Sequence, residues 1–118
     1  MSFSISVSQG IALVQYTGDV GYGERADAVI RSISEVSGLP SLRVLSDFSE
    51  ARVYEESSAS RADFIARVIT APWPQDSRVA LVGLPDDAAL PPKLAAAVRT
   101  LSVQTFNDQR SAIRWLNG

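Results

Sequence analysis

The sequence contains neither cysteine nor histidine. Without cysteine it can form no disulfide, no thiol nucleophile and no cysteine–zinc site. Without histidine, serine–histidine and cysteine–histidine catalysis is excluded, and zinc and copper lose their usual nitrogen ligand. Acid–base chemistry would have to rest on Asp, Glu, Tyr or the single Lys93. We therefore expect a protein that is not an enzyme and that has no metal site and no cofactor.

Long runs of one kind of residue are also absent. The 11 basic and 13 acidic side chains are scattered and give a net charge of −2, so no basic run indicates a nucleic-acid partner. No segment approaches the roughly 20 apolar residues of a membrane span, and the start "MSFSISVSQG" has no charged region or apolar core typical of a signal peptide. These features predict a cytoplasmic protein, with residues 1–118 forming a single domain.

The apolar residues that are present recur with clear periods. Apolar residues alternate with serines over residues 2–8, and a turn at Gln9-Gly10 leads into residues 11–18, which predicts a β-hairpin. Further strands are expected at residues 42–48, 77–84 and 102–106. Spacings of three and four predict a helix around residues 26–36, ended by Gly38 and Pro40. Helices are also expected at residues 57–70, at 85–101 with Pro91 or Pro92 in the first turn, and at 109–116.

The order of these elements determines the fold class. Every strand after the hairpin follows a helix, so these strands should run parallel with right-handed crossovers. The sequence therefore predicts a three-layer α/β domain. It should hold a five-stranded, mostly parallel sheet with an antiparallel N-terminal hairpin strand and four helices.

Four segments carry a family resemblance: "GIALVQYTGDV", "LRVLSDFSEA", "RVALVG" and "VQTFNDQRSAIRWL". They resemble the STAS-like proteins, small bacterial relatives of anti-sigma-factor antagonists. The last segment matches the family's terminal motif at Phe106, Asn107, Asp108, Ala112, Trp115 and Leu116. The resemblance implies a STAS-like fold and a non-enzymatic regulatory role through protein–protein interaction. The family's phosphorylated turn, Asp-Ser-Ser-Gly-Leu, is replaced here by Asp47-Phe48-Ser49-Glu50-Ala51.

The end of the strand at residues 42–48, with the helix that follows it, is the predicted site, because α/β sheets present ligands and partners at the carboxyl ends of parallel strands. The expected partner is an unidentified regulatory protein. The alternative is a small ligand, either a lipid, a nucleotide or an anion, held in a pocket between helices and sheet or on a rim of carboxylates. The predicted partner or ligand surface comprises Tyr22, Ser46, Asp47, Ser49, Glu50 and Arg52. The rim would add Asp19, Asp86, Asp87, Asn107 and Asp108.

Serines near this strand end are candidates for phosphorylation. Ser49, Ser57 and Ser58 are the predicted positions, because a phosphate beside a helix N-terminus is stabilised by the dipole and by free N–H groups. The neighbouring Glu50, Glu55 and Glu56 would repel a phosphate. The alternative is that the serines only cap the helix.

Two further features leave alternatives open. Trp73, between Pro72 and Pro74, is expected to be a lid over the core, and an exposed anchor for a partner is the alternative. The small residues of "KLAAAV" allow a helix to pack closely against the sheet or against a second subunit, so a homodimer stays open.

Overall fold

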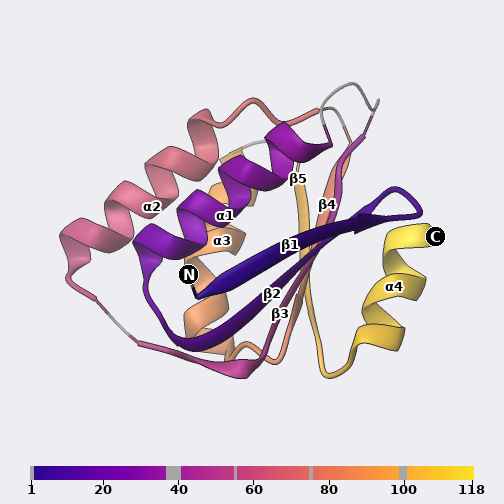
Figure 1. The fold of residues 1–118 in the computed structure, drawn as a ribbon. Helices are drawn as coiled ribbons and strands as arrows, with labels where there is room; N and C mark the ends of the chain where they lie inside the picture. Colours follow the sequence, from indigo (N-terminus) through magenta and orange to yellow (C-terminus); the bar gives the residue numbers. More distant parts are fainter. Residues whose placement is uncertain (1, 37–40, 55, 75, 99–100) are drawn as a thin grey trace.

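A single sheet with helices on both faces makes up the computed structural model, which describes residues 2–36, 41–54, 56–74, 76–98 and 101–118 (Figure 1). The strands are β1 (Phe3–Ser8), β2 (Ile11–Val20), β3 (Arg43–Val53), β4 (Ser77–Val82) and β5 (Leu101–Phe106). The helices are α1 (Tyr22–Glu35), α2 (Ser58–Thr70), α3 (Asp86–Val98) and α4 (Gln109–Asn117). The predicted fold class is confirmed. No helix in this described part is long and apolar enough to cross a membrane.

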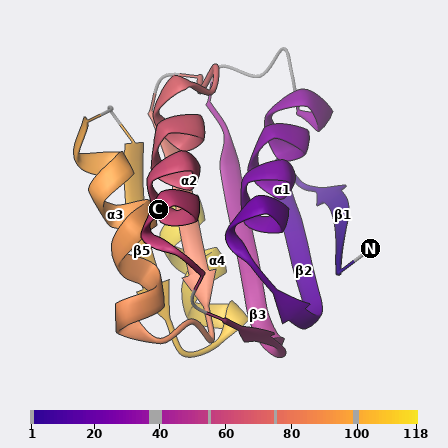
Figure 2. The same ribbon diagram turned by 90° about the vertical axis from the view of Figure 1, so that its left-hand side faces the viewer.

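The strands lie in the order β1-β2-β3-β4-β5, with β1 antiparallel to β2 and the other neighbours parallel. Gln9 and Gly10 have φ values of 54° and 78°, as a tight two-residue hairpin turn requires. Helices α1, α2 and α3 cover one face of the sheet, and α4 alone covers the other (Figures 1 and 2). The sheet is therefore covered unevenly, and β1 lies at its edge.

Helix α4 is fixed to its face of the sheet by burial and by two arginines. Ala112 and Leu116 are fully buried against strand residues that include Leu45. Arg43 Nε donates to the carbonyl of Leu116, and Arg78 donates to the carbonyl of Trp115 over 2.8 Å. Carbonyls in the last turn of a helix have no partner within that helix. The arginines of β3 and β4 therefore complete the C-terminal end of α4.

Helix α1 buries a charged residue that its apolar spacing did not indicate. Arg25 is only 3% exposed, whereas Ile30, expected on the buried face, is 41% exposed. The guanidinium of Arg25 lies between aromatic rings, 5.3 Å from the centre of Tyr22, 5.5 Å from Phe48 and 5.0 Å from Phe64. Cation–π contact of this kind stabilises a buried cation. Gly38 and Pro40, the expected end of this helix, lie outside the described residues.

Two prolines lie in the interior of α3, and the expectation that they would occupy its first turn was wrong. Pro92 has no N–H to donate to the carbonyl of Ala88, one turn earlier. Arg25 Nη2 donates to that carbonyl instead, over 3.1 Å. A side chain of α1 therefore replaces the missing backbone donor of α3.

At the end of α2, the side chain of Trp73 also replaces a backbone donor that a proline lacks. Its Nε1 donates to the carbonyl of Val68 over 2.8 Å, in the position where Pro72 has no N–H to offer. The half-buried indole packs against both the main core and the cluster between the helices. Trp73 therefore covers the core, in the position predicted for a lid.

Strand β3 extends further than the sequence predicts. Its expected end at Phe48 was wrong, because the strand continues to Val53 beside β2. The register shifts from Gln15↔Asp47 to Thr17↔Glu50, so β3 holds one extra residue in a β-bulge. Pairing with β4 stops at Asp47↔Val82. The last part of β3 therefore projects beyond β4.

We expect Gly83→Ala to destabilise the fold by about 1–3 kcal/mol. Gly83 has a φ of 74°, and an added Cβ would lie 3.1 Å from the backbone N and Cα of Ser49. Gly23→Ala is the matched control, because Gly23 lies in α1 with open space around it, and the change should stabilise by up to about 1 kcal/mol. Urea unfolding measures both. Equal effects of the two substitutions would contradict this account of Gly83.

Candidate functional site

The site centres on Asp47, near the point where β3 separates from β4. This residue is only 4% exposed. Its Oδ1 accepts hydrogen bonds from the backbone N of Ser49 at 2.9 Å and from Ser49 Oγ at 2.6 Å. Its Oδ2 accepts from Gln109 Nε2 at 2.5 Å. Because Gln109 is the first residue of α4, Asp47 joins the bulged strand to that helix.

The hydrogen bonds decide the charge of Asp47. Burial acts to raise its pKa, but the bonds from Ser49 and Gln109 outweigh burial and hold the pKa below its ordinary value. Asp47 is therefore an ionised acceptor that already receives three hydrogen bonds. It positions the backbone at Ser49 and is poorly suited to accept a proton from a substrate.

The predicted site residues separate into an interior group and a surface group. Tyr22, Ser46 and Asp47 are at most 5% exposed, so their side chains do not form an outer surface. Ser49, Glu50 and Arg52 are exposed on the projecting part of β3. Arg52 Nε lies 3.9 Å from Asp19 Oδ1, and both side chains are largely in solvent. Such an exposed ion pair is weak, so it leaves the arginine available to a partner.

Tyr54 and Glu56 extend this surface group, and sequence reasoning missed them as site residues. Tyr54 is 45% exposed directly after β3. Glu56 Oε1 accepts a hydrogen bond from the backbone N of Tyr22 at 2.5 Å, at the start of α1. Helix N-termini attract anions, and here a carboxylate of the same chain occupies that position. An external phosphate or nucleotide would have to displace Glu56.

The candidate phosphorylation sites differ in their surroundings. The Ser49 hydroxyl already donates to Asp47, so a phosphate there would meet a carboxylate. Ser57 caps α2 by accepting from the backbone N of Ser60 at 3.2 Å, and Ser58 is the first residue of that helix. A phosphate is electrostatically better placed at Ser57 or Ser58 than at Ser49. Phosphorylation of all three residues stays a prediction.

Among the residues that the structure describes, the predicted rim of carboxylates does not assemble into a cation site. Asp19 pairs weakly with Arg52, and Asp108 caps α4 by accepting from the backbone N of Ser111 at 2.8 Å. Asp87 and Asn107 are exposed, and the side chain of Asp86 lies outside the described set. In the described part of the chain, no group of three or more acidic residues could hold a metal ion. The acidic residues at this edge therefore serve mainly as caps and surface charges.

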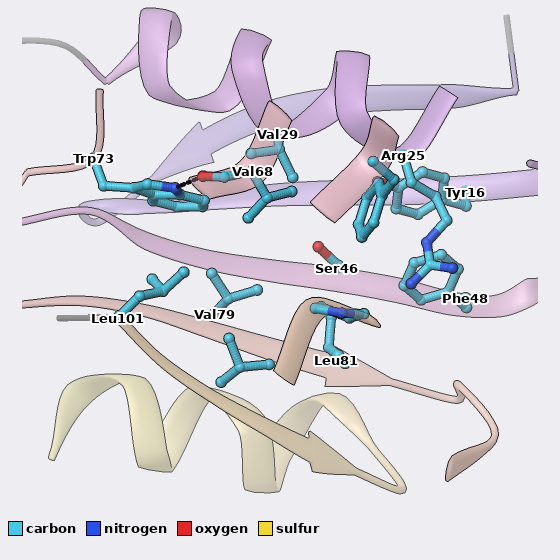
Figure 3. A pocket seen from close by; sticks show the side chains of 13 residues that line it. Tyr16, Arg25, Val29, Ser46, Phe48, Val68, Trp73, Val79, Leu81 and Leu101 are labelled. Carbon is cyan, nitrogen blue, oxygen red and sulfur yellow. Dashed lines mark hydrogen bonds between the residues drawn. The ribbon is translucent and has the colours of Figure 1, made fainter. Parts of the chain in front are cut away.

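A small cavity lies between the helices and the sheet, with Trp73 at one end and Arg25 at the other (Figure 3). Its volume is about 30 Å³, enough for water but far too small for a lipid chain. A lipid would enter only if the helices moved away from the sheet. The cavity is lined by Tyr16, Arg25, Val29, Ser46, Phe48, Phe64, Val68, Trp73, Val79, Leu81, Pro92, Leu101 and Val103.

Comparison with solved structures places this arrangement among known folds. An uncharacterized protein of the DUF3478 family with a SpoIIAA-like fold, from Shewanella loihica PV-4, superposes with a TM-score of 0.58 at 18% identity, over 97% of this chain and 91% of that one. The chain has the SpoIIAA-like fold. The unphosphorylated anti-sigma factor antagonist SpoIIAA itself superposes with a TM-score of 0.52 at 10% identity, over 98% of both chains.

These likenesses confirm the predicted STAS-like fold. No family model and no curated protein sequence matches the chain. At these low identities the likeness concerns the fold alone.

We expect Asp47→Asn to cost about 1–3 kcal/mol of stability at pH 7, because the NH2 group of the amide must face the donors of either Ser49 or Gln109. The folded-state pKa of Asp47 is depressed, so ionised Asp47 stabilises the fold above its unfolded pKa of about 4. This contribution is lost as the pH falls through the folded-state pKa.

Urea titrations between pH 7 and pH 2 measure the difference between wild type and Asp47→Asn, which should shrink below about pH 4. Asp63→Asn, an exposed position on α2, is the control and should change stability little throughout. A difference for Asp47→Asn that stays constant down to pH 2 would exclude the proposed role of its charge.

Proposed function

We propose that the chain is a non-enzymatic regulatory module that binds a protein partner through a β3–α2 surface. This surface comprises Ser49, Glu50, Arg52, Tyr54 and the outer face of α2 at Ala59, Ala62 and Ala66. The observation that carries the proposal is the projection of β3 beyond β4, since residues 50–53 pair with β2 but have no β4 residue opposite them. The fold shared with SpoIIAA supports a regulatory protein-interaction role.

The chemistry of this surface suits a protein rather than a small molecule. Glu50 and Arg52 offer charges of both signs, and Tyr54 adds an aromatic side chain that is 45% exposed. The exposed alanines of α2 let a partner approach that helix closely. Aromatic and arginine side chains contribute most of the binding energy at many protein interfaces. A partner that meets Arg52 and Tyr54 would also contact the start of α2.

The interior residues have a supporting role in this proposal. Asp47 holds the bulge that turns Ser49 outward, and Glu56 fixes the segment between β3 and α2 against α1. A phosphate on Ser57 or Ser58 would add negative charge at the edge of the same surface, about one helical turn before Arg61. Such a modification would weaken the binding of an acidic partner or strengthen the binding of a basic one.

The test is affinity purification of the tagged protein from its native host, with quantitative mass spectrometry of what it binds. We expect Arg52→Glu combined with Tyr54→Ala to reduce recovery of a specific partner by about tenfold or more. Arg110→Glu is the matched charge reversal, because Arg110 is exposed on α4, on the other face of the sheet. The intact mass of the bait in the same preparation shows whether a phosphorylated fraction exists.

Two outcomes would count against the proposal. One is a set of bound proteins that responds equally to both variants. The other is a rise in melting temperature with Mg²⁺, a nucleotide or a fatty acid, since a ligand that binds only the folded state must stabilise it. The second outcome would favour the small-ligand alternative.

A further inference from the structure

The outer edge of β1 has the properties of a self-pairing strand. Among the described residues β1 pairs only with β2, and it lies at the end of the sheet order (Figure 2). It carries no charged residue and no proline, and its pairing with β2 shows no bulge. Proteins usually protect an edge strand with one of these features. The strand itself therefore carries none of these three protections against pairing with another strand.

The backbone groups that face outward can be assigned from the β1–β2 ladder. Thr17 N donates to the carbonyl of Ser2 over 2.8 Å, so Ser2 and Thr17 form a hydrogen-bonded pair. In an antiparallel ladder such pairs occur at every second residue. Ser4, Ser6 and Ser8 therefore direct their N–H and C=O groups toward β2. Phe3, Ile5 and Val7 direct theirs toward the free edge.

The sequence of the strand is symmetric about the central one of these outward residues. In Ser2-Phe3-Ser4-Ile5-Ser6-Val7-Ser8, an apolar residue alternates with serine on both sides of Ile5. An antiparallel pair centred on Ile5 sets Ile5 opposite Ile5 of a second copy and Phe3 opposite Val7. All outward groups of β1 then find partners, with two hydrogen bonds in each opposed pair. A symmetric register centred on Ser4 or Ser6 leaves some of them unpaired within β1.

The side chains agree with the same register. Phe3 and Ile5 pack on the main core, whereas Val7 is 47% exposed. In the centred pair Val7 lies beside Phe3 of the second copy, so both copies bury an exposed apolar side chain. The serines meet on the opposite face, where cross-strand hydroxyl pairs are favourable.

We propose that the chain forms a two-fold symmetric homodimer by antiparallel pairing of β1 with β1 of a second copy, centred on Ile5. The two sheets join into one continuous sheet, and the interface is closed because it is isologous. Pairing of β1 with β5 of another copy would instead add copies head to tail and form an open-ended assembly. Strand β1 and helix α2 lie on opposite sides of α1 (Figure 2). The dimer therefore does not depend on the β3–α2 surface.

Sedimentation of the full chain over a range of concentrations tests the proposal. The wild type should be a dimer that dissociates on dilution. Val7→Lys should weaken the dimer by at least tenfold, because it places a charge at the joined edge. Ser102→Lys puts the same charge on the other edge strand, β5, and should leave the dimer unchanged. A monomer up to about 1 mM, growth beyond dimers, or equal effects of both lysines would overturn the proposal.

Cysteine cross-linking tests the register, and the chain offers a background free of native cysteine. Ile5→Cys should form a disulfide-linked dimer on mild oxidation, because directly opposed hydrogen-bonded residues lie at about 5.5 Å between Cα atoms. Ser8→Cys is the control, since the two copies of residue 8 would lie roughly 20 Å apart along the strands. Cross-linking of Ser8→Cys as fast as Ile5→Cys would refute the centred register.

Discussion

The hydrogen bond from Arg25 to the carbonyl of Ala88 is the interaction on which the helical layer depends. The guanidinium is buried, and its position among Tyr22, Phe48 and Phe64 joins α1 to β3 and α2. The bond to Ala88 adds α3 to the same cluster. A buried cation without such partners would cost several kcal/mol, at least about 3. Pro92 explains the arrangement, since it has no N–H to donate to the carbonyl of Ala88 and Arg25 supplies a donor instead.

Side chains also satisfy backbone groups at other helix ends around the sheet. These bonds explain why the proposed surface is held in one place. Side chains from outside the helices satisfy helix carbonyls at Val68, Trp115 and Leu116. A carboxylate from the segment after β3 satisfies the start of α1, and Asp47 joins β3 to α4. The start of α1 and the end of α4 are therefore fixed by residues distant in sequence. The projecting part of β3 and the outer face of α2 can then meet a partner without ordering the backbone first, which favours binding.

The fold was predictable because its information is local. The alternation at residues 2–8 and the spacing of Phe64 and Val68 each indicate an element without knowledge of the rest. For the candidate site, the sequence predicted a location but not the structure found there. The continuation of β3 was missed because Glu50 and Arg52 suggest a polar loop, although half-buried Ala51 and Val53 alternate with them as strand residues do. The burial of Arg25 was missed because it depends on a carbonyl 63 residues away, which no local period reveals.

The most direct test of this account is a double-mutant cycle between Arg25 and Pro92, followed by urea unfolding. Arg25→Met keeps the apolar stem but removes the donor, and Pro92→Ala restores an N–H that can reach the carbonyl of Ala88. We expect Arg25→Met to destabilise the wild type by about 2–3 kcal/mol. In the Pro92→Ala background it should cost about 1 kcal/mol less. An identical cost in both backgrounds would show that Arg25 does not replace the missing donor of α3, and would contradict the account.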